Sequence, residues 1–88
     1  MSDRLNQFNS SVARVTDDRG SVYGHPKDDF ARIAALWSVL FNVQVAPWQV
    51  PLAMVMVKAS RLMHSPEHLD SYIDIAGYAR TGVMVTDP

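Results

Sequence analysis

Three prolines divide this chain into helical segments, because each stands where a run of apolar residues at helical spacing begins. They are Pro26, Pro47 and Pro66. A proline fits the first turn of a helix, whose N–H groups have no partner within the helix, and disrupts a helix further in. The pattern predicts helices over about 26–41, 47–64 and 66–84.

The clearest of these helices is the one predicted over 26–41. Asp28 and Asp29 place negative charge in its first turn, where the helix dipole favours it, and Asn42 is a plausible end. Its apolar residues recur at intervals of three and four: Phe30, Ile33, Ala34, Trp37, Leu40 and Phe41.

The boundaries of the other segments follow from turn and cap residues. Residues 19–25 contain two glycines and predict a loop, and Ser65 is the expected N-cap of the helix that Pro66 opens. Pro51 predicts either a kink or a delayed start in the helix before it. No stretch alternates as a strand does.

We therefore expect an all-α protein, a small bundle built on an antiparallel hairpin of the last two helices. Helix 26–41 is expected to pack across that hairpin. Residues 1–18 form a polar N-terminal segment whose sparse apolar positions allow a weak helix, and residues 19–88 form a single domain.

The length and the net charge of the chain limit the classes of protein to which it can belong. The 88 residues suffice for one domain, and a net charge of −1 argues against broad nucleic-acid binding. The absence of cysteine excludes disulfides and thiolate metal sites. The longest apolar run, 50–57, is far shorter than the roughly 20 residues that cross a bilayer, so we expect a cytoplasmic protein. Five methionines, two tryptophans and only 19% charged residues favour a homo-oligomer.

Four charged side chains on the last two helices are the main candidate site. Lys58 and Arg61 lie one turn apart, and Asp70 and Asp74 follow on a stripe with Tyr78. Counted from the turn, the two cations and the two carboxylates stand at matching heights. One interpretation is two structural ion pairs, Arg61–Asp70 and Lys58–Asp74. The other is a pocket in which the two cations bind phosphate, and both can hold in one network.

A second candidate lies just before helix 26–41. Gly24 precedes a helix N-terminus, whose free N–H groups favour an anion, and His25 stands at its mouth beside Tyr23. The alternative is structural, with Tyr23 packed on the core and His25 capping the helix. The pattern alone does not decide between them.

Taken as a set, several short motifs resemble a family of small, largely uncharacterised proteins of bacteriophages and prophages. The resemblance covers about residues 19–85 and is carried mainly by the first and last of the motifs. They are Tyr23-Gly24-His25-Pro26, Asp29-Phe30, Ile33-Ala34, Leu36-Trp37-Ser38, Lys58-x-x-Arg61, Asp70-Ser71 and Asp74-Ile75-Ala76-Gly77-Tyr78-Ala79.

The last two helices are also distantly similar to the core of the MazG-like all-α nucleoside-triphosphate pyrophosphohydrolases. That family holds magnesium with acidic motifs on two successive helices. Asp70 and Asp74 match the second motif, but Lys58 and Arg61 stand where the first has glutamates. Magnesium catalysis requires clustered carboxylates, so this departure favours a non-catalytic site that needs no cofactor.

We expect a phage-type protein that binds a nucleotide-derived small molecule in the host cytoplasm, such as a sponge for a defence signal. The expected ligand-binding residues share polar or aromatic side chains near the two candidate sites: Tyr23, His25, Lys58, Arg61, Asp70, Asp74 and Tyr78. The first alternative is a magnesium-dependent pyrophosphohydrolase. The second is a structural or protein-interaction module.

Overall fold

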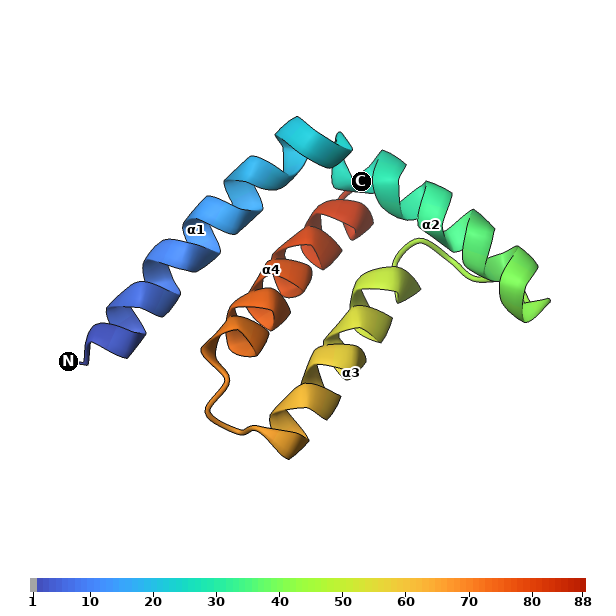
Figure 1. The fold of residues 1–88 in the computed structure, drawn as a ribbon. Helices are drawn as coiled ribbons and strands as arrows, with labels where there is room; N and C mark the ends of the chain where they lie inside the picture. The colour runs from blue at the N-terminus through green and yellow to red at the C-terminus, as the bar shows by residue number, and fades with distance from the viewer. Residues whose placement is uncertain (1) are drawn as a thin grey trace.

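The computed structural model describes residues 2–88, and for residues 15–23 it describes the backbone alone. These residues form four α-helices and no strand, so the all-α prediction is confirmed (Figure 1). The helices are α1 (Asp3–Tyr23), α2 (Pro26–Phe41), α3 (Gln49–His64) and α4 (Leu69–Thr86).

Helix α4 is central to the arrangement. It runs back beside α3 after a short turn and is flanked on its other side by α1, while α2 lies across one end of the α3–α4 pair (Figure 1). The molecule is elongated, with principal extents of 45 × 29 × 21 Å. The first helix of the chain therefore packs against the last one.

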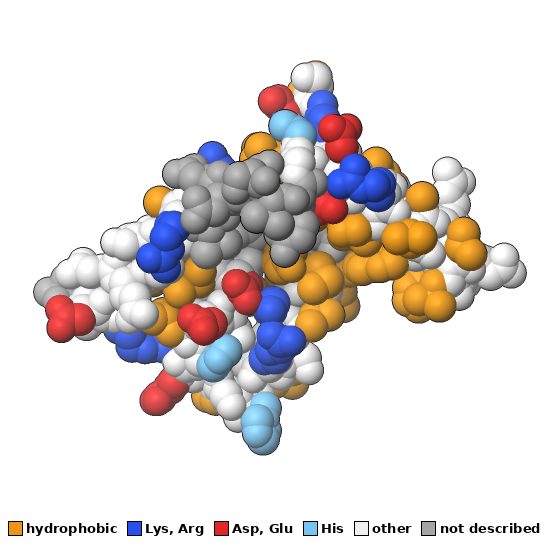
Figure 2. Space-filling model, turned by 45° about the horizontal axis from the view of Figure 1, so that its top comes forward, with side chains coloured by type: hydrophobic (Ala, Val, Ile, Leu, Met, Phe, Trp, Pro, Cys, Tyr) orange, Lys and Arg blue, Asp and Glu red, His pale blue; other side chains and the backbone are white. Residues whose placement is uncertain are grey.

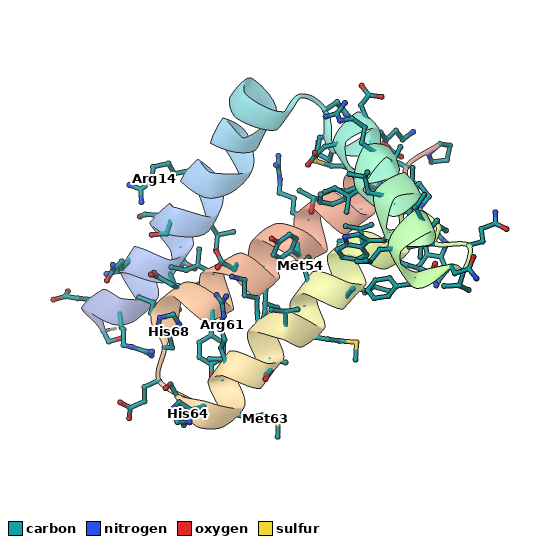
Figure 3. All side chains as sticks on the ribbon, turned by 45° about the vertical axis from the view of Figure 1, so that its right-hand side comes forward. Arg14, Met54, Arg61, Met63, His64 and His68 are labelled. Atoms are coloured by element: carbon teal, nitrogen blue, oxygen red, sulfur yellow. The ribbon has the colours of Figure 1, made fainter. Side chains whose placement is uncertain are left out.

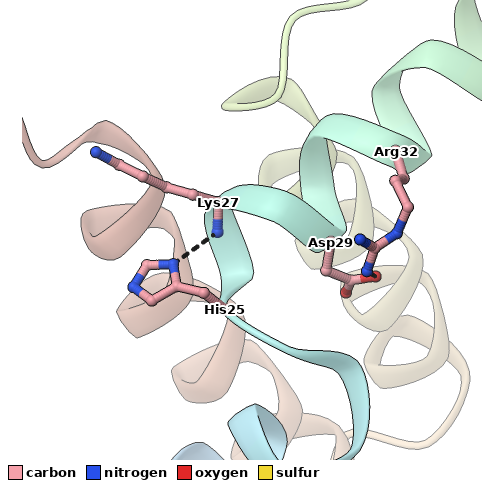
Figure 4. A network of polar contacts seen from close by, with 4 residues as sticks. All are labelled: His25, Lys27, Asp29 and Arg32. Atoms are coloured by element: carbon pink, nitrogen blue, oxygen red, sulfur yellow. Dashed lines mark hydrogen bonds and ion pairs between the residues drawn. The ribbon is translucent and has the colours of Figure 1, made fainter.

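Helix α2 has the predicted bounds, and both of its ends are capped. The Lys27 backbone N–H donates to His25 Nδ1 over 3.1 Å, so His25 is the N-cap that leads into Pro26 (Figure 4). Asn42 takes the left-handed conformation, with φ 53°, and its N–H donates to the Ser38 carbonyl. Asparagine is one of the few residues that adopts this conformation readily, which explains why the helix ends there.

The loop predicted over 19–25 is wrong, because α1 continues to Tyr23. The turn between α1 and α2 is reduced to Gly24 and His25. Gly24 has φ 77°, a left-handed conformation that favours glycine over residues with a Cβ. The packing of α1 along α4 supplies the stabilisation that the polar sequence of α1 lacks.

The predicted start of the last helix at Pro66 is also wrong, since α4 begins at Leu69. Ser65 ends the preceding helix instead of capping the next one, because its N–H donates to the Arg61 carbonyl over 2.8 Å. Its carbonyl then accepts from the His68 N–H at 3.0 Å, which closes a turn. Because Ser65 belongs to the hydrogen-bonded turn that ends α3, it does not act as the N-cap of α4.

Pro51 is the third residue of α3 and is buried. The N–H groups of the first turn have no carbonyl partner within a helix, so a proline at this position removes no hydrogen bond. The expected helix start at Pro47 is displaced by two residues, because Pro47 and Trp48 lie in a turn.

The core is small. Apart from the prolines Pro26 and Pro51, four hydrophobic side chains are buried among the described residues: Phe30, Ala34, Val50 and Ile73. Partly buried side chains pack around the first three, and these are Ile33, Trp37, Val45, Tyr78 and Val85. The core thus lies where α2 crosses α3 and α4.

Candidate functional site

The candidate site centres on an ion pair between α3 and α4. Lys58 Nζ lies 2.9 Å from Asp74 Oδ2, as one of the two interpretations of the charged cluster predicted. The Lys58 side chain is only 12% exposed and that of Asp74 is 36% exposed. The ammonium is therefore held in place in the seam between the two helices, with water reaching mainly the carboxylate.

The second predicted pair is absent. Arg61 and Asp70 are both exposed, and no ion pair joins them in the part of the chain that the structure describes. Exposed partners are well solvated separately, so a pair between them gains little. Arg61 therefore presents a guanidinium to solvent one turn beyond Lys58.

Charged and imidazole side chains gather on the face that carries this site. Figure 2 shows cations, carboxylates and a histidine together between α1 and α3. His68 belongs to the turn before α4, and Figure 3 shows its ring on the same side of the molecule as Arg61. His68 Nδ1 lies 2.7 Å from the hydroxyl of buried Ser71, which fixes the ring at the start of α4.

The remaining predicted site residues do not join this cluster. His25 Nδ1 accepts the Lys27 N–H, and no hydrogen bond or ion pair among the described side chains links His25 to Lys58 or Arg61. Tyr78 is half-buried and packs against the core. The Tyr23 side chain lies outside the described residues, so its predicted role stays a prediction.

Two polar contacts near the helix starts were not predicted from the sequence, although Asp29 itself was expected in the first turn of α2. Asp29 is buried next to core residue Phe30, and its Oδ1 lies 3.6 Å from the Arg32 guanidinium (Figure 4). Arg4 on α1 donates to the Glu67 carbonyl in the turn before α4. No local pattern signals the Arg4 contact, because it joins residues 63 positions apart.

A groove of about 500 Å³ lies beside the Arg4 contact, between α1 and α4. Its walls are mostly apolar and include Leu5, Phe8, Leu69 and Ile75.

The described residues contain no group of three or more His, Asp or Glu placed to hold a metal ion. Over the same residues, none of the helices has the length and apolar character needed to span a membrane.

Comparison with known proteins identifies the family of this chain. The chain is similar to the Gene 55 protein of Mycobacterium phage L5, with 36% identity over 66 residues, which are 74% of this chain and 42% of the phage protein. The Gene 55 protein of Mycobacterium phage D29 is also 36% identical, over 65 residues, 74% of this chain and 43% of its own length. The chain thus spans less than half the length of these relatives.

No solved structure matches the chain. The similarity to phage proteins agrees with the phage family expected from the sequence motifs. Residues 7–86 match the family described as a domain of unknown function, DUF6378, and the chain belongs to that family.

Proposed function

We propose that the chain binds the phosphate groups of a nucleotide-derived small molecule at Lys58 and Arg61, without a metal ion and without hydrolysing it. The observation that carries this proposal is the Lys58–Asp74 pair, with exposed Arg61 one turn away. The pair already fixes the lysine, so little side-chain entropy is lost when an anion arrives. Arg61 supplies a planar fork of donors that matches phosphate oxygens.

The charge balance of the cluster supports binding over hydrolysis. Asp70 and Asp74 are the carboxylates of α4, and Asp74 is paired with Lys58. A magnesium ion needs several oxygen ligands with little positive charge beside them. In the distant resemblance to MazG-like pyrophosphohydrolases, Lys58 and Arg61 replace the first acidic motif. Such a replacement keeps affinity for phosphate and removes the metal.

The similarity to phage proteins supports a biological role for such binding. The similar proteins are phage proteins, and a small phage protein that holds a nucleotide-derived signal without converting it lowers the free concentration of that signal in the host cell. The proposed class of ligand therefore includes cyclic nucleotides, dinucleotides and nucleoside triphosphates.

Isothermal titration in EDTA with ATP and with cyclic dinucleotides tests the proposal. Arg61→Gln is expected to weaken binding about tenfold, which is about 1.4 kcal/mol. Lys27→Gln is the matched control, since it removes one exposed cation from α2 and leaves the cluster intact. Equal loss of affinity in both variants would show a general charge effect and contradict a site at Arg61.

Asp74→Asn separates this proposal from the pyrophosphohydrolase alternative. A binding protein is expected to keep its affinity for phosphate in this variant, because the amide oxygen of the asparagine can still accept a hydrogen bond from Lys58 and hold the ammonium, while the negative charge that repels the ligand is gone. An enzyme that uses Asp74 to hold magnesium loses pyrophosphate release in the same variant. If no ligand binds in EDTA and the wild-type chain releases pyrophosphate with magnesium, the alternative is correct.

A further inference from the structure

A long stretch of this chain carries no charge. Between Arg32 and Lys58 lie 25 residues, 33–57, without Asp, Glu, Lys, Arg or His. They form most of α2, the connection to α3 and the first half of α3. All 17 acidic and basic residues (eight Lys and Arg plus nine Asp and Glu) lie in the rest of the chain.

This uncharged segment is not buried. Among the described residues, nine of the thirteen exposed large hydrophobic side chains belong to it, and Figure 2 shows apolar side chains spread over the α2 end of the molecule. The nine are Leu36, Val39, Leu40, Phe41, Val43, Trp48, Leu52, Met56 and Val57. Surfaces that stay in water rarely combine so many large apolar groups with no charge, whereas the centres of homodimer interfaces do.

Helix α3 shows the feature most sharply, because residues 50–57 are apolar on every side. One side, with Val50 and Pro51, is buried in the fold. The other side carries what we name the outer stripe: Leu52, Met56, Ala59 and Met63, spaced four, three and four residues apart. Leu52 is 56% exposed, Met56 73% and Met63 88%, and Figure 3 shows Met63 at the lower end of α3. A helical segment that is apolar all round belongs inside an assembly, and the spacing of the stripe is that of a helix–helix seam.

The total surface of the chain agrees with a missing partner. Its accessible surface is 6116 Å², whereas a compact monomer of 9.8 kDa exposes about 5,200 Å². The radius of gyration is 14.1 Å, against about 12 Å for a compact domain of this length. The excess of roughly 900 Å² is close to the ~800 Å² that each partner buries in a standard interface.

We propose that the uncharged surface of α2 and α3 is a homodimer interface in which the outer stripes of two α3 helices pack antiparallel. The partner is a second copy of this chain, because two identical uncharged surfaces can pack together without repulsion between like charges. The intervals of the stripe read the same in both directions. Antiparallel pairing therefore sets Leu52 against the partner's Met63 and Met56 against the partner's Ala59.

The charges of α3 decide between antiparallel and parallel pairing. Lys58, Arg61 and His64 all lie in the C-terminal half of the helix. A parallel pair would bring the two sets of cations to the same end, whereas an antiparallel pair places each set beside an uncharged half.

A neighbouring groove of about 590 Å³, lined by Trp37, Phe41 and other apolar groups, extends the apolar surface from α3 to α2.

Sedimentation equilibrium of the full chain gives the first test, and it does not depend on the phosphate site. The expected mass is twice 9.8 kDa at micromolar concentration. Met56→Glu is expected to weaken the dimer at least a hundredfold, and Val83→Glu, at a comparably exposed apolar position of α4, is expected to leave it unchanged. A monomeric wild-type chain, or a Met56→Glu variant as dimeric as the wild type, overturns the proposal.

Cysteine cross-linking gives a second test that does not need a stable monomer, and the chain has no cysteine of its own. A mixture of Leu52→Cys and Met63→Cys chains is expected to form a mixed disulfide on oxidation. Either variant alone is expected to cross-link poorly, because an antiparallel seam separates identical positions by 11 residues, about 16 Å. Efficient cross-linking of each variant with itself, and none in the mixture, overturns the antiparallel arrangement.

Discussion

The Lys58–Asp74 ion pair makes an asymmetric prediction about stability. Asp74→Asn leaves an ammonium that is only 12% exposed without its counter-charge, whereas Lys58→Met leaves a carboxylate that is 36% exposed and can be hydrated. Breaking fully buried pairs by removing one partner costs about 3–5 kcal/mol, and exposed pairs contribute about 0–1 kcal/mol. The Lys58–Asp74 pair is neither fully buried nor fully exposed, so we expect the cost of breaking it to lie between these two ranges.

We therefore expect Asp74→Asn to lower the free energy of unfolding by about 2 kcal/mol and Lys58→Met by about 1 kcal/mol. For a domain of this size, 2 kcal/mol corresponds to a fall in Tm of about 8–16 °C. In the double variant neither charge is stranded, so its loss is expected to be smaller than the sum of the single losses by about 1 kcal/mol.

Urea unfolding followed by circular dichroism measures all four proteins of this cycle. The protein concentration must be the same throughout, because association stabilises the folded chain by mass action. Additive losses would show that the two groups do not interact in solution. A larger loss in Lys58→Met than in Asp74→Asn would refute the reasoning from exposure.

Two further predictions concern the backbone. Gly82→Ala is expected to raise the free energy of unfolding by about 0.5–1 kcal/mol, because an added Cβ meets only the Pro51 ring, with Cγ at 3.7 Å and Cβ at 3.9 Å, which are ordinary contacts, while alanine favours the helix; a fall in Tm would contradict this. At Asn42, with φ 53°, Asn42→Ala is expected to cost about 1 kcal/mol and Asn42→Gly almost nothing, as thermal unfolding of the pair can check.

The sequence predicts α2 well because its ends are set locally. His25, Pro26 and Asn42 act within one turn of the residues that they cap, so neighbours in the sequence suffice. The end of α1 and the start of α4 depend on more. α1 extends to Tyr23 along α4, and Ser65 is taken by the end of α3. The residue pattern of one segment does not show which of two segments will use a given residue or surface.

The candidate site shows the same division. Counting residues from the turn gives the correct pairing of Lys58 with Asp74, because helical rise fixes relative height. It does not give exposure, and exposure decides that Arg61 and Asp70 stay apart. The burial of Asp29 and the contact between Arg4 and Glu67 arise only when distant segments pack together.

The packing of α1 against α4 has a consequence for how the protein is made. Translation delivers α1 first and α4 last of the four helices, at roughly 5–20 residues per second. Until α4 leaves the ribosome, α1 lacks the helix against which it mainly packs, whereas α3 and α4 meet across a short turn soon after both are made. During synthesis the uncharged middle segment thus stays exposed for several seconds before α4 completes the packing.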